Sequence, residues 1–269
     1  MSRTPPRSPP RPLPTPRTHR RWLIIGAFVG AFAAIVVVAG VTIINRIETG
    51  RWEVPDKGDF MRVASGRPRP ASKTIFLARQ PLELVPGVDD APRGVSSVLA
   101  NAANKPMKLP GWKGNNATWS KLVACVREQF HPFDVTVTDE RPLHEDFVLV
   151  AVGGKPADLG IKDKRIGGLA PFNGEVIPVP VVYAFSAALR HDVRAICETI
   201  AMEVAHAYGL DHGYECKDVM TYLTGCGAKK FVDKEVRCGE KKARDCEGGT
   251  PTQNSYKHLI SVLGSRSRP

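Results

Sequence analysis

Acidic residues are absent from the beginning of this chain, and more than half of its net positive charge lies there. Residues 1–21 contain seven prolines and six arginines but no aspartate or glutamate. Such a stretch cannot build a hydrophobic core, so we expect a solvated tail that is partly polyproline II. Without those six charges the formal net charge of +11 falls to +5 for residues 46–269, because residues 22–45 carry none. No nucleic-acid partner is needed to explain the basic balance, and none is expected.

Aromatic residues are scarce, and no internal repeat is visible. The 269 residues are 42% hydrophobic but only 7% aromatic. This length and composition allow one medium-sized domain with appendages rather than two full domains. We place that domain at residues 73–264, between a linker at 45–72 and a tail at 265–269.

Charge is also missing from the 23 residues between Trp22 and Ile44. As a helix they would extend about 34 Å, enough for a hydrocarbon core of about 30 Å. Arginines precede this segment, whereas mixed charges follow it, so the positive-inside rule predicts a cytoplasmic N-terminus. The chain is therefore predicted to be a single-pass membrane protein with a signal-anchor helix at 22–44 and an exported C-terminal domain. A cleaved signal peptide, which would leave a secreted protein, is the alternative, because Arg20-Arg21 resembles a twin-arginine signal.

Cysteine is absent before the apolar segment, and all six cysteines follow it: Cys125, Cys197, Cys216, Cys226, Cys238 and Cys246. An even number in an exported domain predicts disulfides, and no C-x-x-C motif favours zinc binding by these cysteines. Six cysteines allow 15 connectivities, which the sequence alone does not resolve. Short separations favour Cys216 with Cys226 and Cys238 with Cys246, which leaves Cys125 with Cys197.

The predicted domain alternates between apolar runs and one clear helical repeat. Strands are predicted at 73–79, 133–138, 147–152 and 179–185, with a weaker one at 167–172. Helical spacing from Trp119 to Phe130 predicts a helix with Thr118 as N-cap, and residues 256–263 predict a last short helix. No element is predicted in the proline- and glycine-rich stretch 80–113.

Asp192 is a predicted N-cap for a helix that runs to about Tyr208. At about 100° per residue, its apolar residues fall on one face, whereas Met202, Glu203 and His206 fall near the other. The motif residues are therefore predicted to point away from the core. The second face carries Glu203 and His206, and Gly209 and His212 follow beyond the helix. These four residues match the zinc-protease pattern H-E-x-x-H-x-x-G-x-x-H. A histidine is missing at the first position, where the chain has Met202.

This pattern resembles the metzincin clan of zinc metallopeptidases over most of residues 73–225. Residues 218–222 are similar to the methionine-containing turn of that clan. The resemblance implies an α/β (α+β) fold in which a twisted mixed sheet carries a backing helix and an active-site helix, followed by a small, here cysteine-rich, C-terminal part. The sequence around the motif also resembles predicted exported bacterial proteins in which another residue replaces the first histidine.

The resemblance implies a role for each motif residue. His206 and His212 would bind zinc through neutral imidazoles, and Glu203 would act as general base. Gly209 would allow the sharp turn, often with positive φ, that returns His212 to the metal. Met220 would lie beneath the metal, and Tyr222 would be a further zinc ligand or an oxyanion stabiliser.

Met202 leaves three outcomes open, because a thioether is a soft ligand that does not replace imidazole on zinc. Zinc could be held by the two motif histidines and Tyr222. A histidine from elsewhere could complete the shell, with His131, His144 and His191 as candidates. Alternatively, the cleft could bind a partner without metal. The expected function is a membrane-anchored, exported zinc metallopeptidase acting on a peptide or protein substrate; the alternative is a noncatalytic pseudoprotease that acts as a membrane-tethered binding protein.

Overall fold

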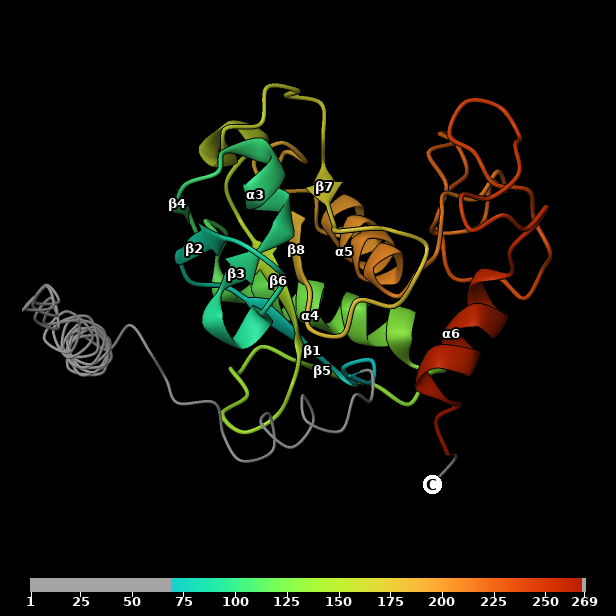
Figure 1. Cartoon of the computed structure of the whole chain (residues 1–269), viewed down its shortest axis with the longest axis horizontal. Coiled ribbons are helices and arrows are strands. Elements are labelled where there is room, and N and C mark those ends of the chain that lie inside the picture. The colour runs from blue at the N-terminus through green and yellow to red at the C-terminus, as the bar shows by residue number, and fades with distance from the viewer. Residues whose placement is uncertain (1–68, 268–269) are drawn as a thin grey trace, which may run out of the picture. The chain divides into compact units, whose positions relative to one another are not determined.

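A five-stranded mixed sheet organises the computed structural model, which describes residues 69–267 (Figure 1). Its strands are β1 (Thr74–Ala78), β5 (Thr136–Thr138), β6 (Val148–Val152), β7 (Gly168–Leu169) and β8 (Val181–Ala184). Their spatial order is β5-β1-β6-β8-β7. All neighbours are parallel except β7, which runs antiparallel to β8 at one end of the sheet. The other edge of β7 is therefore not paired with any strand of the described residues.

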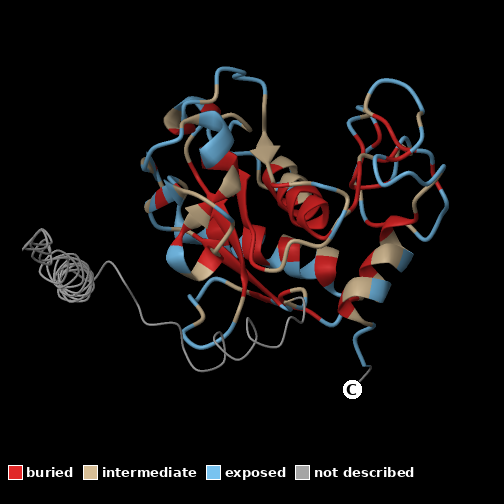
Figure 2. Cartoon of the chain, in the orientation of Figure 1, coloured by how far each residue is buried: buried red, intermediate tan, exposed pale blue. Residues whose placement is uncertain are grey.

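The central strands are covered on both faces. Every residue of β1, β6 and β8 is buried (Figure 2), as expected for apolar runs without alternation. Helices α4 (Asn116–Phe130) and α5 (Val193–Ala207) pack on one face, and a smaller sheet with α3 (Ser97–Ala102) packs on the other (Figure 1). The sheet thus separates two hydrophobic cores.

The two long helices begin at polar caps. The Asp192 side chain accepts a hydrogen bond from the Ala195 N–H at the start of α5, which confirms the predicted N-cap. The predicted cap of α4 was wrong, because Asn115, and not Thr118, is its N-cap and accepts from the Thr118 N–H. A disulfide between Cys125 and Cys197 joins α4 to α5.

Residues 80–113 contain elements that the sequence analysis did not predict. They form β2 (Leu82–Pro86), β3 (Val95–Ser96), β4 (Met107–Leu109), α3 and the 3₁₀ turn η1 (Ala91–Arg93). The three strands form their own sheet in the order β3-β2-β4. Each strand is too short to show a period, and proline or glycine interrupts the pattern between them. A second short 3₁₀ turn, η2 (Pro156–Leu159), follows β6.

The C-terminal part has little regular structure and is held by disulfides. Cys216 is bonded to Cys226 and Cys238 to Cys246, which confirms both short-range pairings. The last helix, α6 (Ser255–Leu263), packs on the α4 and α5 side of the sheet through Leu259 and Leu263. The predicted α/β fold with a twisted mixed sheet, helices and a disulfide-rich C-terminal part is confirmed.

The described residues belong to a compact unit that begins at Arg69. The predicted tail at 1–21, the signal-anchor helix at 22–44 and most of the linker at 45–72 lie outside the described residues. Within residues 69–267, no helix is both long enough and apolar enough to cross a bilayer.

Candidate metal centre and active site

The turn after α5 brings the two motif histidines together. Gly209 has a φ of +94°, a conformation that side chains disfavour, and an added Cβ would lie 3.2 Å from the Gly174 carbonyl oxygen. The chain reverses there, and the Nε2 atoms of His206 and His212 lie 3.0 Å apart. Two nitrogens at about 2.0–2.1 Å from one tetrahedral zinc ion would be separated by roughly 3.3 Å. The observed separation is close to that value.

The Nδ1 atoms of the His206 and His212 rings already have acceptor partners. His206 Nδ1 lies 2.7 Å from the carbonyl oxygen of Leu210, and His212 Nδ1 lies 2.9 Å from Glu240 Oε1. A carbonyl or carboxylate oxygen only accepts hydrogen bonds, so Nδ1 carries a proton in both rings. Both Nε2 atoms then present lone pairs to each other. Only a proton or a metal cation between them makes this arrangement favourable, so the donor set fits a cation.

Burial favours neutral forms of two motif residues. Burial, with a smaller contribution from His212, lowers the pKa of His206 to about 4, so its ring is neutral at pH 7. Burial also raises the pKa of Glu203 to about 8. Within the described residues its carboxyl group receives no hydrogen bond, and it is 6% exposed. In the metal-free protein Glu203 is therefore largely protonated at neutral pH.

This raised pKa predicts a distinctive pH dependence of stability. Between the ordinary pKa of 4.5 and about 8, the folded protein keeps a proton on Glu203 that the unfolded chain has lost. Folding stability therefore falls as pH rises through that window, by up to about 1.4 kcal/mol per pH unit. Glu203→Gln removes this dependence, so chelator-treated variant and wild type should diverge between pH 5 and 8 in favour of the variant. Denaturant unfolding at several pH values measures the difference, and parallel profiles would refute the burial of an unpaired carboxyl.

The edge strand β7 packs directly over Glu203. A Cβ added at Gly168 would lie 2.6 Å from both Cγ and Oε1 of Glu203, so only glycine fits there. Gly168 was not predicted as a site residue, because a lone glycine in a weak strand has many explanations. The prediction that the motif face of α5 points away from the core was wrong. Instead, the helix is buried all round from Ile200 to Ala207, because β7 and the segment after it cover the second face.

The methionine turn lies beside His212. Met220 is fully buried, and its backbone oxygen accepts from the Gly213 N–H at 2.9 Å. The Tyr222 ring is centred 4.3 Å from the His212 ring and is 55% exposed. Partial burial, and then the charges of Glu203 and Glu240, raise the pKa of the Tyr222 hydroxyl. Tyr222 therefore lies close to one predicted ligand and within electrostatic reach of the predicted base.

The other candidate ligands lie differently. Met202, one turn before His206 on α5, is 8% exposed and belongs to the hydrophobic core. Among the described residues, the groupings of three metal-ligand atoms include none of His131, His144 and His191. His191 instead packs edge-on against Trp112, with ring centroids 5.9 Å apart. Within the described residues, none of these three histidines therefore joins His212 in a group of potential ligands.

Asp211, His212 and Glu240 form one group of three potential metal ligands, and their ligand atoms lie within 4.8 Å of one another. Arg244 already forms ion pairs with both carboxylates, at 2.6 Å to Asp211 and 2.8 Å to Glu240. A second grouping contains Cys238 and Cys246, which are bonded to each other and offer no thiolate. Glu240 and Arg244 were not predicted, because they follow the motif by about thirty residues without any recognisable spacing.

A cavity of about 700 Å³ is lined in part by residues 169–173, which include the end of β7. Phe172 lines it and also contacts His206, with ring centroids 5.5 Å apart. Its walls come from the segment after β7 and from the region around α3, and they are mostly apolar, with Val88, Val98, Ile161, Leu169 and Ile177 among them. The cavity therefore touches β7 through Leu169 and is linked to His206 through Phe172.

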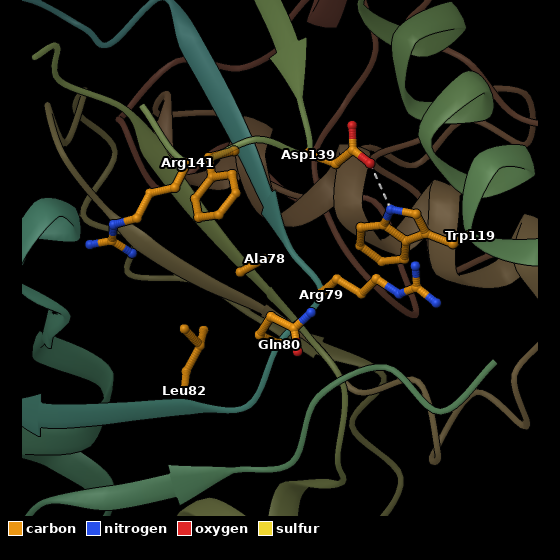
Figure 3. Close-up of a pocket in the computed structure, with 8 residues that line it drawn as sticks. Ala78, Arg79, Gln80, Leu82, Trp119, Asp139 and Arg141 are labelled. Carbon is orange, nitrogen blue, oxygen red and sulfur yellow. Dashed lines mark hydrogen bonds between the residues drawn. The ribbon is translucent and has the colours of Figure 1, made fainter. Parts of the chain in front are cut away.

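A second cavity of about 420 Å³ lies at the end of β1, where Arg79 and Arg141 flank it (Figure 3). Arg79 donates to Asn116 and lies over the Trp119 ring, and Trp119 donates to Asp139 at 2.9 Å. Arg141 donates to a backbone carbonyl oxygen. These polar groups are satisfied within the protein, in contrast to the facing Nε2 atoms of the histidines.

No protein-family model matches the sequence, and no curated protein matches it. The resemblance to metzincins stays a prediction from the motif residues.

Proposed function

We propose that residues 73–264 form a metzincin-like zinc metallopeptidase in which His206 and His212 hold the metal and Glu203 is the general base. The facing Nε2 atoms carry this proposal. Each belongs to a ring whose tautomer is set by a partner on Nδ1, and together they offer two lone pairs 3.0 Å apart. A structural pair of histidines without a ligand would instead place a donor opposite an acceptor.

When bound, a zinc ion supplies Lewis acidity that polarises a carbonyl group and lowers the pKa of a water molecule. Glu203 lies one turn from His206 and is not itself among the zinc ligands of the motif. A nearby positive charge favours its ionised form over the protonated form that burial alone favours. The ionised carboxylate would take a proton from the attacking water and deliver it to the leaving amine.

Tyr222, whose ring lies beside that of His212, supports the same reaction. Its raised pKa keeps the hydroxyl protonated at neutral pH, so it can donate a hydrogen bond to a developing oxyanion. The resemblance to metzincins gives this tyrosine the alternative role of a further metal ligand, which would partly replace the imidazole missing at Met202.

An extended peptide is the substrate class that best suits the site. The unpaired edge of β7 can add a peptide strand through backbone hydrogen bonds, and the adjacent apolar cavity can take a hydrophobic side chain. The three disulfides support an exported domain, because disulfides persist in oxidising compartments. Anchoring through residues 22–44 belongs to the same proposal.

Metal analysis of the purified full-length protein tests this function. We expect about one zinc ion per chain, as for a single catalytic site. Zinc added back to chelator-treated protein at roughly 100 times its Kd should raise the free energy of unfolding by about 2.7 kcal/mol, whereas magnesium should not. Absence of both bound zinc and stabilisation would favour the noncatalytic binding protein, which Met202 makes the second candidate.

A further inference from the structure

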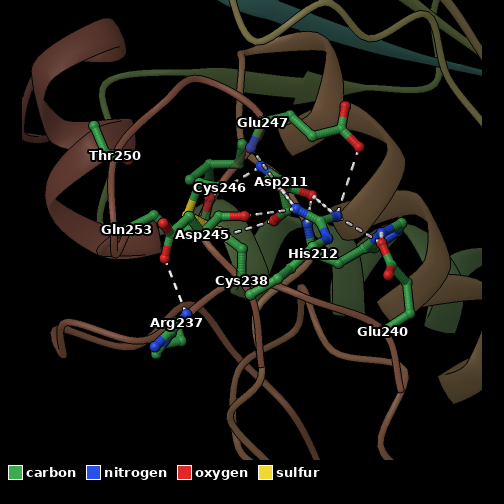
Figure 4. A network of polar contacts seen from close by, with 12 residues as sticks. Asp211, His212, Arg237, Cys238, Glu240, Asp245, Cys246, Glu247, Thr250 and Gln253 are labelled. Carbon is green, nitrogen blue, oxygen red and sulfur yellow. Dashed lines mark hydrogen bonds and ion pairs between the residues drawn. A yellow bond between two sulfur atoms is a disulfide. The ribbon is translucent and has the colours of Figure 1, made fainter. Parts of the chain in front are cut away.

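Glu240 reaches the candidate metal site from a part of the chain that the motif does not include. Its Oε1 atom lies 2.9 Å from His212 Nδ1, across 28 residues of sequence (Figure 4). No other hydrogen bond within the described residues engages His212 Nδ1. The orientation of this ring therefore depends on the loop that carries Glu240.

Arg244 holds Glu240 in place. Its guanidinium donates to Glu240 Oε1 at 2.8 Å and forms two hydrogen bonds, of 2.6 and 3.0 Å, with the carboxylate of Asp211. Asp211 is 3% exposed and also accepts from the backbone N–H of His212 at 2.7 Å. One arginine thus ties together the two carboxylates that contact His212. Forked, charge-assisted contacts of this kind are geometrically specific.

The loop itself is closed on both sides of Glu240. The Cys238–Cys246 disulfide spans eight residues, and the Gly239 N–H donates to the His212 carbonyl oxygen at 2.9 Å. Gly239 has a φ of +131°, and an added Cβ would lie 2.0 Å from the Lys242 carbonyl oxygen. The backbone at Glu240 cannot shift without breaking these contacts.

We propose that Glu240 is a positioning residue that holds His212 in the Nδ1–H tautomer and directs its Nε2 lone pair at the metal, with Arg244 and the disulfide loop as its support. This proposal rests on the proposed function, and it names a residue that the motif does not contain. A carboxylate that accepts from the outer nitrogen of a metal-bound imidazole fixes its orientation and raises its basicity, and losing such a partner costs about 10–100-fold in metal affinity.

The first test reads the tautomer without metal. Nitrogen-15 NMR of histidine-labelled, chelator-treated full-length protein distinguishes Nδ1–H from Nε2–H, and His212→Asn assigns the signal. Wild type should show a protonated Nδ1 at His212, also when the two Nε2 atoms share a proton, whereas Glu240→Ala should populate the form in which only Nε2 is protonated. Glu240→Gln, whose amide oxygen can still accept, should retain more of the Nδ1–H form. An unchanged tautomer in Glu240→Ala would overturn the proposal.

The second test measures zinc affinity by competition with a chelating indicator. Glu240→Ala should weaken zinc binding by about 10–100-fold, and Glu240→Gln by less. Glu247→Ala is the matched control, because Glu247 lies 3.6 Å from Arg244 but is not hydrogen-bonded to His212. Equal affinities of wild type and Glu240→Ala would overturn the proposal while leaving the metal site intact. Failure of wild type to bind zinc would instead refute the proposed metal site, and the tautomer measurement would still decide the role of Glu240.

Discussion

Replacing Glu203 by glutamine is expected to lower kcat for peptide hydrolysis by about 10²–10⁴-fold, the usual contribution of a positioned general base. Glutamine has nearly the same shape, so it fits beneath Gly168, but its amide cannot take a proton from water. The carboxyl group receives no hydrogen bond within the described residues, so the substitution leaves no partner unpaired there. Steady-state hydrolysis of a peptide library by the zinc-loaded full-length protein measures the effect.

Zinc affinity must be followed in the same variant. Glu203 is not a predicted ligand, so its loss should change zinc affinity far less than kcat. Glu198→Gln is the matched control on the same helix, because Glu198 accepts from the Lys229 N–H and lies outside the site. Full activity in Glu203→Gln would exclude the proposed base, whereas equal losses in both variants would point to a general effect on α5.

Local signals were sufficient to predict the elements that carry the motif. The apolar run that forms β6 and the Asp192 cap of α5 depend on neighbouring residues, and both were found from the sequence. The reversal at Gly209 could also be expected, because a glycine that ends a helix usually adopts positive φ. The disulfide pairings followed from short separations and the remaining pair.

Features that depend on distant contacts were not predictable in this way. Glu240 reaches His212 only because the Cys238–Cys246 loop folds back on the motif, and no spacing rule links the two residues. Gly168 matters because the sheet order places β7 over Glu203. The small sheet formed by residues 82–109 arises from strands of five, two and three residues, which are too short to carry a period.

Met202 is the position at which the chain departs from the metal-binding pattern, and its surroundings explain how that departure is tolerated. The side chain is 8% exposed and packs with the core on the α4 side of the sheet. A flexible thioether fills such a space well, but it is a poor ligand for zinc. The helix nevertheless keeps the four-residue spacing from Met202 to His206 that places two side chains on one face.

We expect Met202→His to tighten zinc binding by about 100-fold. Zinc binding to a four-ligand site contributes about 10–16 kcal/mol, or roughly 2.5–4 kcal/mol per ligand. Part of this gain is lost because the imidazole replaces an apolar side chain. Competition with a chelating indicator measures the affinity. Arg194→His is the control for adding a histidine to α5, because it lies about 18 Å along the helix from His206.

The outcome separates two explanations of the histidine pair. If affinity rises in Met202→His but not in Arg194→His, the turn of α5 before His206 faces the metal, and the natural chain has a weakened version of a three-histidine site. If neither variant gains affinity, position 202 does not face the Nε2 atoms of His206 and His212. That result would exclude the three-histidine geometry, and the metal content of the wild type would still decide whether the facing nitrogens share a metal ion or a proton.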